Sequence, residues 1–570
     1  MINFLIYLFN NIYLIVPSIE QIIGIIGLVI FIFTSITIGS LVTKKNNLSA
    51  NFFIGYSVNY IFCLFLFLLK INVNYSFFSL IIITFIFFFK NIDLYFEIFK
   101  KKFNQNKLKV ILFLPLFTIL ISSDAIGWDT FTHWLPLADG LKSLDHYPLK
   151  GHGKYYPFAS SLVLSNSSIF IDNISENISA IFSFFLLILF VQNLENIYKD
   201  IFNISHKNTF TFFLILFVFY NPIHMNKFIF TAYSDFISGI LFFFVFYEMY
   251  KYFNKINNLN IFSLSLMASL MIGLKNTGLI LVLILFITFL IYLFFQKNLN
   301  KKNFYSLLLF LIIPLLIYMI WYLTLKINNV FVDNFFKFPL FKEENIIFFK
   351  SAWSQVLTRP IFFTTSIFII LMIPFSSFFK NEKFKLIYNL SFLYVIVFFL
   401  WISFVISTYI FHFDINVFYA NSFWRYCSQI SLLCTFIFGF YIVFLLEKIK
   451  LFNFKIIGMI FLILILINPI IFSYKLRRDI DPISLEIKKF RKYENQFKKV
   501  FLSVKNNAYE TVRLNYYLQK PYSNDIVESL NIENISITEF RNKTLENKYQ
   551  LYIYLKKDNN NKLKKQIYLK

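Results

Sequence analysis

The stretch TGLILVLILFITFLIYLFF, residues 277–295, contains no charged residue and is long enough to cross a lipid bilayer as a helix. A spanning helix needs roughly 20 predominantly apolar residues to cross about 30 Å of hydrocarbon. By this criterion the chain contains about fourteen candidate spans, and residues 2–16 form a further, ambiguous stretch. The candidates lie near residues 21–43, 51–69, 75–90, 108–123, 177–194, 208–221, 235–252, 260–274, 277–295, 304–325, 361–379, 386–410, 425–446 and 455–473.

The composition agrees with a membrane protein. The chain has 570 residues, of which 58% are hydrophobic and 22% aromatic, and its mean hydropathy is +0.65. These values exclude a single water-soluble core. The formal charge of +24 comes from short clusters between apolar stretches, which argues against a nucleic-acid partner. Cys63, Cys427 and Cys434 show no disulfide or metal spacing and are expected to be packing residues.

Lysine and arginine collect in every second connection between the predicted spans, and these connections all lie on one side of the membrane. The distribution predicts that this side is cytoplasmic. The other side then receives residues 124–176, 222–234, 326–360, 411–424 and everything after about residue 474. The basic connections contain Lys44-Lys45, Lys100 to Lys102 with Lys107 and Lys109, Lys251 with Lys255, Lys297 with Lys301 and Lys302, Lys380 with Lys383 and Lys385, and Lys448 with Lys450.

After Tyr474 the chain becomes mixed and charged for about a hundred residues. Residues 498–504 and 549–555 have the pattern of strands, and Tyr509 to Leu518 that of a helix. We therefore predict a small α/β domain over residues 474–570, outside the membrane, following a transmembrane domain over residues 1–473. A poorly ordered tail is the alternative.

The loop 124–176 is the richest in chemically active side chains. It begins with SSDAIGWDTFTHWLP, residues 122–136, and it contains three of the six histidines, His133, His146 and His152. Carboxylates at the end of an apolar span are costly unless they face water, a cation or a partner, so Asp124 and Asp129 are functional candidates. If this segment is helical, Asp129 and His133 share a face. The structural alternative is that Asp124 caps this helix and Asp129 pairs with His133.

The Asp-x-x-x-His-Trp-Leu-Pro pattern that begins at Asp129 resembles the GT-C superfamily of membrane glycosyltransferases, especially bacterial relatives of protein mannosyltransferases and lipid A aminoarabinose transferases. In these enzymes an acidic residue in the first large outer loop is catalytic, and a polyprenyl phosphate or pyrophosphate carries the sugar. By position Asp129 is the best match to that residue and Asp124 the second. The loop usually follows the first span of the family, whereas here it follows about the fourth.

Three further segments resemble the superfamily in the same order along the chain. Thr231-Ala232-Tyr233-Ser234-Asp235 is similar to a second outer acidic position, although Asp235 is also placed to cap a helix. Gly273-Leu274-Lys275-Asn276-Thr277-Gly278 resembles a turn whose lysine faces the donor phosphate. Asn421-Ser422-Phe423-Trp424-Arg425-Tyr426 resembles an Arg-Tyr at the start of a late span. Arg425 could clamp phosphate bidentately or extend to the lipid headgroups. Arg359 is a weaker candidate for the same role.

The resemblance implies a polytopic, all-α, GT-C-like protein of about 13–15 transmembrane helices in the cell inner (plasma) membrane. It implies an inverting glycosyltransferase in which Asp129, with Asp124 or Asp235, activates the acceptor. Lys275 and Arg425 would hold the lipid phosphate, and His133 would orient the carboxylate or the acceptor. The expected partners are a polyprenyl-phosphate-linked sugar, membrane lipids, and a glycan, lipid or protein acceptor. The resemblance implies no definite cofactor, and a divalent cation is compatible with the sequence, although no ligand spacing demands one.

Two other classes of protein stay open. A flippase or transporter for a lipid-linked glycan places ionisable residues along a mid-membrane pathway, whereas here they lie mostly at span ends. A polysaccharide polymerase or ligase commonly places its arginine and histidine residues in large, late outer loops. A structural membrane protein without chemistry is a third alternative.

Overall fold

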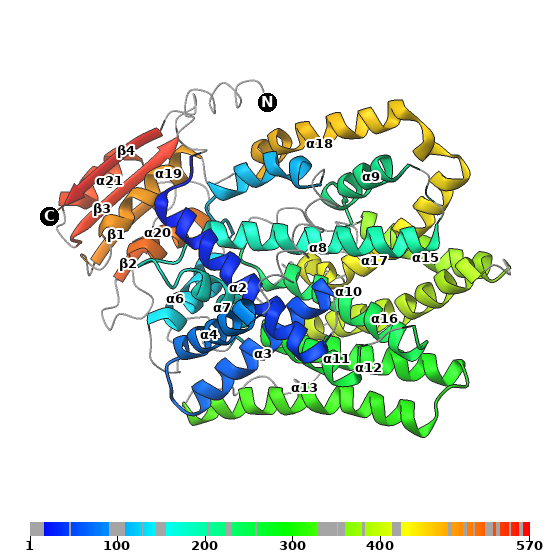
Figure 1. Cartoon of the computed structure of the whole chain (residues 1–570). Helices are drawn as coiled ribbons and strands as arrows, with labels where there is room; N and C mark the ends of the chain where they lie inside the picture. The colour runs from blue at the N-terminus through cyan, green and yellow to red at the C-terminus, as the bar shows by residue number, and fades with distance from the viewer. Residues whose placement is uncertain are drawn as a thin grey trace.

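The computed structural model describes most of the chain (Figure 1). The described residues are 16–44, 47–90, 109–127, 129–143, 156–202, 204, 206–223, 231–256, 259–328, 350, 360–378, 382–412, 423–476, 481–493, 496, 499–504, 508–518, 528–531, 536–545, 549–557 and 563–569.

Each of the fourteen candidate spans is largely helical, whereas the ambiguous stretch 2–16 lies almost wholly outside the described residues. Eight of these helices are long and apolar enough to cross a membrane, namely α2, α3, α8, α10, α12, α13, α16 and α17, and the others have shorter apolar segments. By length and composition the chain is therefore a membrane protein. The helices are α2 (Ile19–Thr43), α3 (Leu48–Leu68), α4 (Asn74–Lys90), an unlabelled helix over Lys109–Ile121, α8 (Asn177–Ile201), α9 (Lys207–Phe219), α10 (Ser234–Phe253), α11 (Ile261–Leu274), α12 (Gly278–Phe295), α13 (Lys301–Ile327), α15 (Pro360–Phe378), α16 (Glu382–His412), α17 (Phe423–Lys448) and α18 (Lys455–Leu476).

Short polar side chains begin several of these helices. Ser18 accepts a hydrogen bond from the backbone N–H of Gln21, and the side chain of Gln21 accepts one from the backbone of Ser18. This reciprocal pair satisfies backbone donors that an α-helix leaves open at its start. Asn47, Asn260 and Asn300 cap α3, α11 and α13 with their side-chain oxygens.

Helices α2 and α3 lie side by side because glycines remove the side chains between them. A Cβ at Gly39 would overlap the backbone carbonyl of Asn51, and a Cβ at Gly55 would overlap that of Ser35. In a membrane, small residues let helix backbones approach and gain packing contacts. These two glycines therefore set the separation of α2 and α3.

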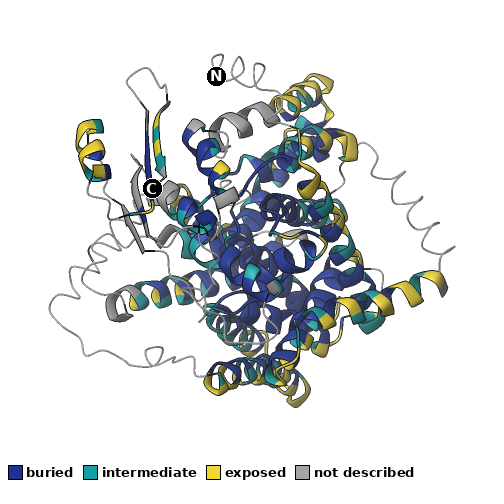
Figure 2. Cartoon of the chain, turned by 90° about the vertical axis from the view of Figure 1, so that its left-hand side faces the viewer, coloured by how far each residue is buried: buried dark blue, intermediate teal, exposed yellow. Residues whose placement is uncertain are grey.

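The outward faces of the bundle are apolar. Figure 2 shows buried residues gathered in the centre of the bundle and exposed residues on its outer helices. Helices α13 and α18, on opposite margins of the bundle in Figure 1, expose large side chains such as Leu316, Met319, Met459 and Ile463. Exposed apolar surface of this extent fits contact with lipid rather than water.

The loop after the helix over residues 109–121 folds back onto the bundle. It forms the π-helix η2 (Thr130–Trp134), which continues into α6 (Leu135–Ser143), and later α7 (Ala159–Ser167). The hydroxyl of Ser161 donates to the carbonyl of Trp134 at 2.9 Å, which ties α7 to η2. The side chains of Trp134 and Leu162 are buried.

The C-terminal residues form a four-stranded sheet at one end of the bundle (Figure 1). The strand order is β2-β1-β3-β4, in which β1 is parallel to β2 and β3, and β4 is antiparallel to β3. One cluster packs Val500, Leu514 and Leu551 together, and a second packs Phe540 against Tyr552 and Tyr554. The elements are α19 (Pro482–Lys488), η6 (Lys489–Tyr493), β1 (Lys499–Val504), α20 (Ala508–Leu518), β2 (Glu528–Asn531), α21 (Ile537–Leu545), β3 (Leu551–Lys557) and β4 (Leu563–Leu569).

This sheet agrees with the α/β character predicted for the C-terminal segment. The predicted strands correspond to β1 and β3, and the predicted helix to α20. The elements α19, β2, α21 and β4 were not predicted, because they are short or follow no clear apolar alternation.

Candidate active site

Four of the predicted site residues meet where helices begin or end. Asp129 directly precedes η2, Asp235 lies in the first turn of α10, and Lys275 follows the last residue of α11. Arg425 lies in the first turn of α17. Although these residues come from distant parts of the chain, ion pairs connect all four. We call these four residues the ion cluster.

Arg425 lies between the two carboxylates of the ion cluster. Its Nη1 is 2.5 Å from Oδ2 of Asp129, and its Nη2 is 3.0 Å from Oδ2 of Asp235. Its Nε donates to the same oxygen of Asp235 at 3.3 Å. The guanidinium carbon lies 4.4 Å from the centre of the Tyr233 ring. A planar fork of donors suits this bridging position, and the aromatic face adds a cation–π contact.

Asp235 is wholly buried and both of its carboxylate oxygens accept hydrogen bonds. Its Oδ1 accepts from Nζ of Lys275 at 2.5 Å and from Nε2 of Gln429 at 2.7 Å, while its Oδ2 is held by Arg425. Tyr233, not Asp235, occupies the N-cap position of α10, so the capping alternative is wrong. A carboxylate with this many donors stays ionised and orients the two cations.

Asp129 is the more accessible carboxylate of the ion cluster. Its side chain is 16% exposed, against 0% for Asp235, and among the described residues Arg425 is the one ion-pair partner of its carboxylate. The backbone N–H of Asp129 points to the hydroxyl of Tyr233 at 3.4 Å. Asp129 is therefore the carboxylate of the cluster with the freedom to accept a proton from a bound molecule.

Gly127 allows the segment before Asp129 to lie against Tyr233. Its φ of 105° is in the region that favours glycine, and a Cβ there would lie 2.9 Å from the hydroxyl of Tyr233. A larger residue would both strain the backbone and push this segment away from the ring.

Three tyrosines surround the ion cluster. The ring of Tyr426 lies 4.8 Å from Nζ of Lys275. Burial raises the pKa of Tyr233 to about 12, with a further contribution from Asp129 that Arg425 partly offsets. Burial and the same carboxylate raise the pKa of Tyr156. Both phenols therefore stay protonated near neutral pH and can donate hydrogen bonds.

His133 does not lie on the α-helical face that was predicted to join it to Asp129. The N–H of Leu135 bonds to the carbonyl of Thr130, five residues earlier, so the segment is a π-helix and the spacing expected of an α-helix does not apply. The His133 ring packs at 5.1 Å on Tyr156. Single π-helical turns occur frequently at functional sites.

Asp124 lies in a different network from the other predicted acids. Its carboxylate is 2.8 Å from Nζ of Lys488 and 3.2 Å from Nη2 of Arg513, and Nε2 of Gln21 donates to it at 3.3 Å. Lys488 and Arg513 belong to the C-terminal α/β segment. Asp129, not Asp124, is at the N-cap position of η2, so the alternative in which Asp124 caps this helix is also wrong.

Some predicted candidates fall outside the described residues. Arg359 is one of them, and His146 and His152 are others. In the part of the chain that is described, no group of three or more His, Cys, Asp or Glu side chains is placed to hold a metal ion.

A search of protein-family models, curated proteins and solved structures finds no match to the chain. What the site can do therefore follows from its own residues. The ion cluster offers a carboxylate that is partly accessible beside two cations that a buried carboxylate holds in place. Such an arrangement can remove a proton from a nucleophile and neutralise an anionic leaving group.

Several residues of the site were not predicted. Gln429 lies one helical turn after Arg425, and its side-chain amide donates to Asp235. The hydroxyl of Thr277 donates to the side-chain oxygen of Gln429 at 3.2 Å. A glutamine inside an apolar span is an available signal, because polar groups there are costly. Tyr156 belongs to the loop that was singled out, but no role was assigned to it. Glu176 directly precedes the predicted span 177–194 and so carries the same signal as Asp124, whereas Arg513 carries no local signal.

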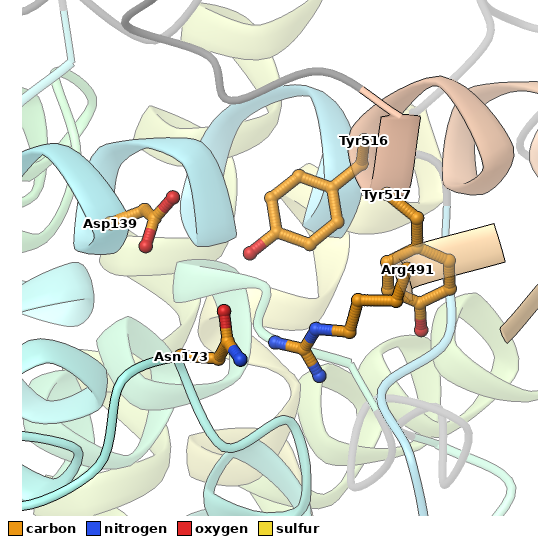
Figure 3. Close-up of a pocket in the computed structure, with 5 residues that line it drawn as sticks. All are labelled: Asp139, Asn173, Arg491, Tyr516 and Tyr517. Carbon is orange, nitrogen blue, oxygen red and sulfur yellow. The ribbon is translucent and has the colours of Figure 1, made fainter. Parts of the chain in front are cut away.

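A pocket lies at the seam between the outer loop and the C-terminal segment (Figure 3). Asp139 of α6 and Asn173 line one side, and Arg491 of η6 with Tyr516 and Tyr517 of α20 line the other. In Figure 3 the Asp139 carboxylate and the Tyr516 hydroxyl point toward the centre of this group. The pocket is polar and distinct from the ion cluster.

Proposed function

We propose that this chain is a GT-C-like membrane glycosyltransferase with about 13–15 transmembrane helices. It transfers a sugar from a polyprenyl-phosphate-type lipid donor to an acceptor at the outer face of the inner membrane, with inversion at the anomeric carbon. The observation that carries the proposal is the ion cluster, in which a partly exposed carboxylate adjoins two cations at helix ends.

The orientation of the chain supports this proposal. Asp129, Asp235, Lys275 and Arg425 all lie at span ends for which the lysine distribution predicts the outer side. Lys275 and Arg425 are cations at outer span ends, whereas the clusters of basic residues in the short connections lie on the other side, and a lipid-linked phosphate gives their position a reason. Asp124 contacts Lys488 and Arg513, so the C-terminal α/β segment adjoins the start of the outer loop, which supports the proposal that both are outside the membrane on the same side.

The proposed reaction uses these residues as a base and a phosphate clamp. Asp129 accepts the proton of the acceptor hydroxyl or amine, and the acceptor atom forms a bond to the anomeric carbon as the carbon–oxygen bond to phosphate breaks. The electron pair leaves with the lipid phosphate, whose charge Lys275 and Arg425 neutralise. Asp129 then releases its proton to water. A single attack of this kind inverts the anomeric centre.

The charge balance of the ion cluster indicates how donor and base are coupled. Its two carboxylates and two cations sum to zero, so a donor phosphate must compete for a cation. Arg425 should exchange its ion pair with Asp129, rather than that with Asp235, for an ion pair with the phosphate. The reason is that Asp129 is the more exposed and less hydrogen-bonded of the two carboxylates. Donor binding would thus free Asp129 from its ion pair and make it available as a base.

An assay of the purified protein with a labelled polyprenyl-phosphate sugar in lipid vesicles tests this function. Transfer of single sugars to an acceptor is the expected result. Extension of whole glycan chains would instead support a polymerase or ligase. Movement of the lipid across the vesicle without bond cleavage would support a flippase or transporter, and would overturn the proposal.

A further inference from the structure

Arg513 of α20 is a buried cation that joins the C-terminal α/β segment to the helix bundle. Its side chain is 0% exposed, and its Nη2 lies 3.2 Å from Asp124 and 3.6 Å from Glu176. Its Nε donates to the hydroxyl of Tyr517 at 3.0 Å, and that hydroxyl in turn donates to Glu176 at 2.5 Å. A buried charge is tolerated when it is paired and hydrogen-bonded in this way.

The two carboxylates that Arg513 binds belong to the other side of the seam. Glu176 is the residue before α8, and Asp124 follows the helix over residues 109–121. Both are buried. Burial raises the pKa of Glu176, and the charge of Arg513 opposes this effect. Without the C-terminal segment, these carboxylates would lose Arg513 and Lys488, their cationic partners across the seam.

The same helix also contacts the π-helix that follows Asp129. The ring of Phe131 lies 5.6 Å from that of Tyr516 and 6.2 Å from that of Tyr517, and the Arg513 guanidinium lies 5.5 Å from Phe131. The C-terminal segment therefore holds the chain at Asp124 and again at Phe131. Asp129 lies between these two anchors.

We infer that the C-terminal α/β segment positions Asp129 in the ion cluster, with Arg513 as its anchoring residue. This inference rests on the proposed function, because it assigns Arg513 a role in the transfer step without contact to the reacting atoms. Loss of Arg513 lets the segment 124–131 move, so that Asp129 no longer has a fixed position against Arg425. Tyr516 and Tyr517 also line the pocket of Figure 3, so the same loss opens that pocket.

The experiment compares Arg513→Met, Arg513→Lys and Arg541→Met in the full-length protein in lipid nanodiscs. Arg541 is an exposed arginine of α21 and serves as the matched control. The first readout is the kcat and the donor KM of sugar transfer. The second is the rate at which maleimide labels a cysteine introduced by Thr132→Cys in η2. The native Cys63, Cys427 and Cys434 are buried and should react slowly.

We expect Arg513→Met to lower kcat by about tenfold to a hundredfold with little change in donor KM, because the base is misplaced while the cations stay. The labelling rate of Arg513→Met should rise. Arg513→Lys should bring both kcat and the labelling rate part of the way back to the parent values, and Arg541→Met should match the parent in both. Unchanged kcat and labelling in Arg513→Met would overturn the inference. If Arg513→Met does not accumulate, Arg513→Lys carries the same two readouts. If the parent protein transfers no sugar, the proposed function fails, and unchanged labelling would still overturn the anchoring role of Arg513.

Discussion

Arg425 binds Asp235 through both Nη2 and Nε, at 3.0 and 3.3 Å, although 190 residues separate them. The contact joins the first turn of α17 to the first turn of α10. Because Asp235 also holds Lys275, one buried carboxylate fixes both cations of the ion cluster. Asp235 therefore holds the ion cluster together, and Asp129 is the more exposed carboxylate, to which the proposed function assigns the role of base.

Replacing Asp235 should affect stability more than replacing Asp129. Asp235→Asn removes the negative charge between two buried cations, and breaking a buried ion pair on one side costs about 3–5 kcal/mol. We expect a clear fall in the thermal unfolding temperature of the purified protein, and a smaller one for Asp129→Asn, whose site is partly exposed. Equal stability of Asp235→Asn and the parent would show that the cluster does not organise this region.

Arg425 should control the use of the donor. Arg425→Met removes the fork that we assign to the phosphate, and hydrogen bonds to charged groups contribute about 1.5–3 kcal/mol. The donor KM should therefore rise by about tenfold or more. Arg425→Lys keeps the charge but loses the bidentate geometry, so its donor KM should lie between that of the parent protein and that of Arg425→Met. A fall in kcat with an unchanged donor KM would remove Arg425 from the phosphate site.

The close contact of α2 and α3 makes a separate prediction about packing. Gly39→Ala places a methyl group against the backbone carbonyl of Asn51, which cannot move without shifting α3. We expect a destabilisation of about 1–3 kcal/mol. Gly458→Ala is the control, because its nearest neighbour is the hydroxyl of Thr209 at 3.0 Å, a side-chain atom that can rotate. Thermal unfolding of both variants in the same detergent measures the difference, and equal values would contradict the account of this contact.

Glu486 gives the C-terminal segment a weak dependence on pH. Burial opposes ionisation of Glu486, but hydrogen bonds from Lys489 and Lys565 outweigh it and hold its pKa below the ordinary value of 4.5. A carboxyl with a lowered pKa stabilises the folded state above its unfolded pKa, and this contribution is lost as the pH falls through the lowered value. Both lysines are well exposed, so the effect should be small.

Limited proteolysis between pH 3 and pH 7 measures this dependence. Resistance of residues 481–570 should fall below about pH 4.5, and Glu486→Gln should reduce the change. A variant with the same acid profile as the parent would show that Glu486 contributes nothing.

The sequence predicts what is encoded locally. Hydropathy identifies the spans because each is a continuous apolar stretch, and polar groups at span ends identify Asp129, Asp235, Lys275 and Arg425. It does not reveal how Asp124 is used, because its partner Arg513 is 389 residues away in a helix of ordinary composition. The π-helical geometry of η2 is likewise not predicted, because no spacing of apolar or polar residues distinguishes its hydrogen bond from Leu135 to Thr130 from that of an α-helix.

The turnover of a labelled polyprenyl-phosphate sugar by Asp129→Asn, beside its donor affinity, tests the central claim most directly. Removing a general base typically lowers the rate by about 10²–10⁴-fold. Asp129→Asn also removes the ion pair between Asp129 and Arg425, which competes with the donor phosphate for Arg425. The donor should therefore bind at least as tightly as in the parent protein. We therefore predict a large loss of kcat with an unchanged or lower donor dissociation constant. Turnover near that of the parent would contradict the role of Asp129 and with it the proposed mechanism.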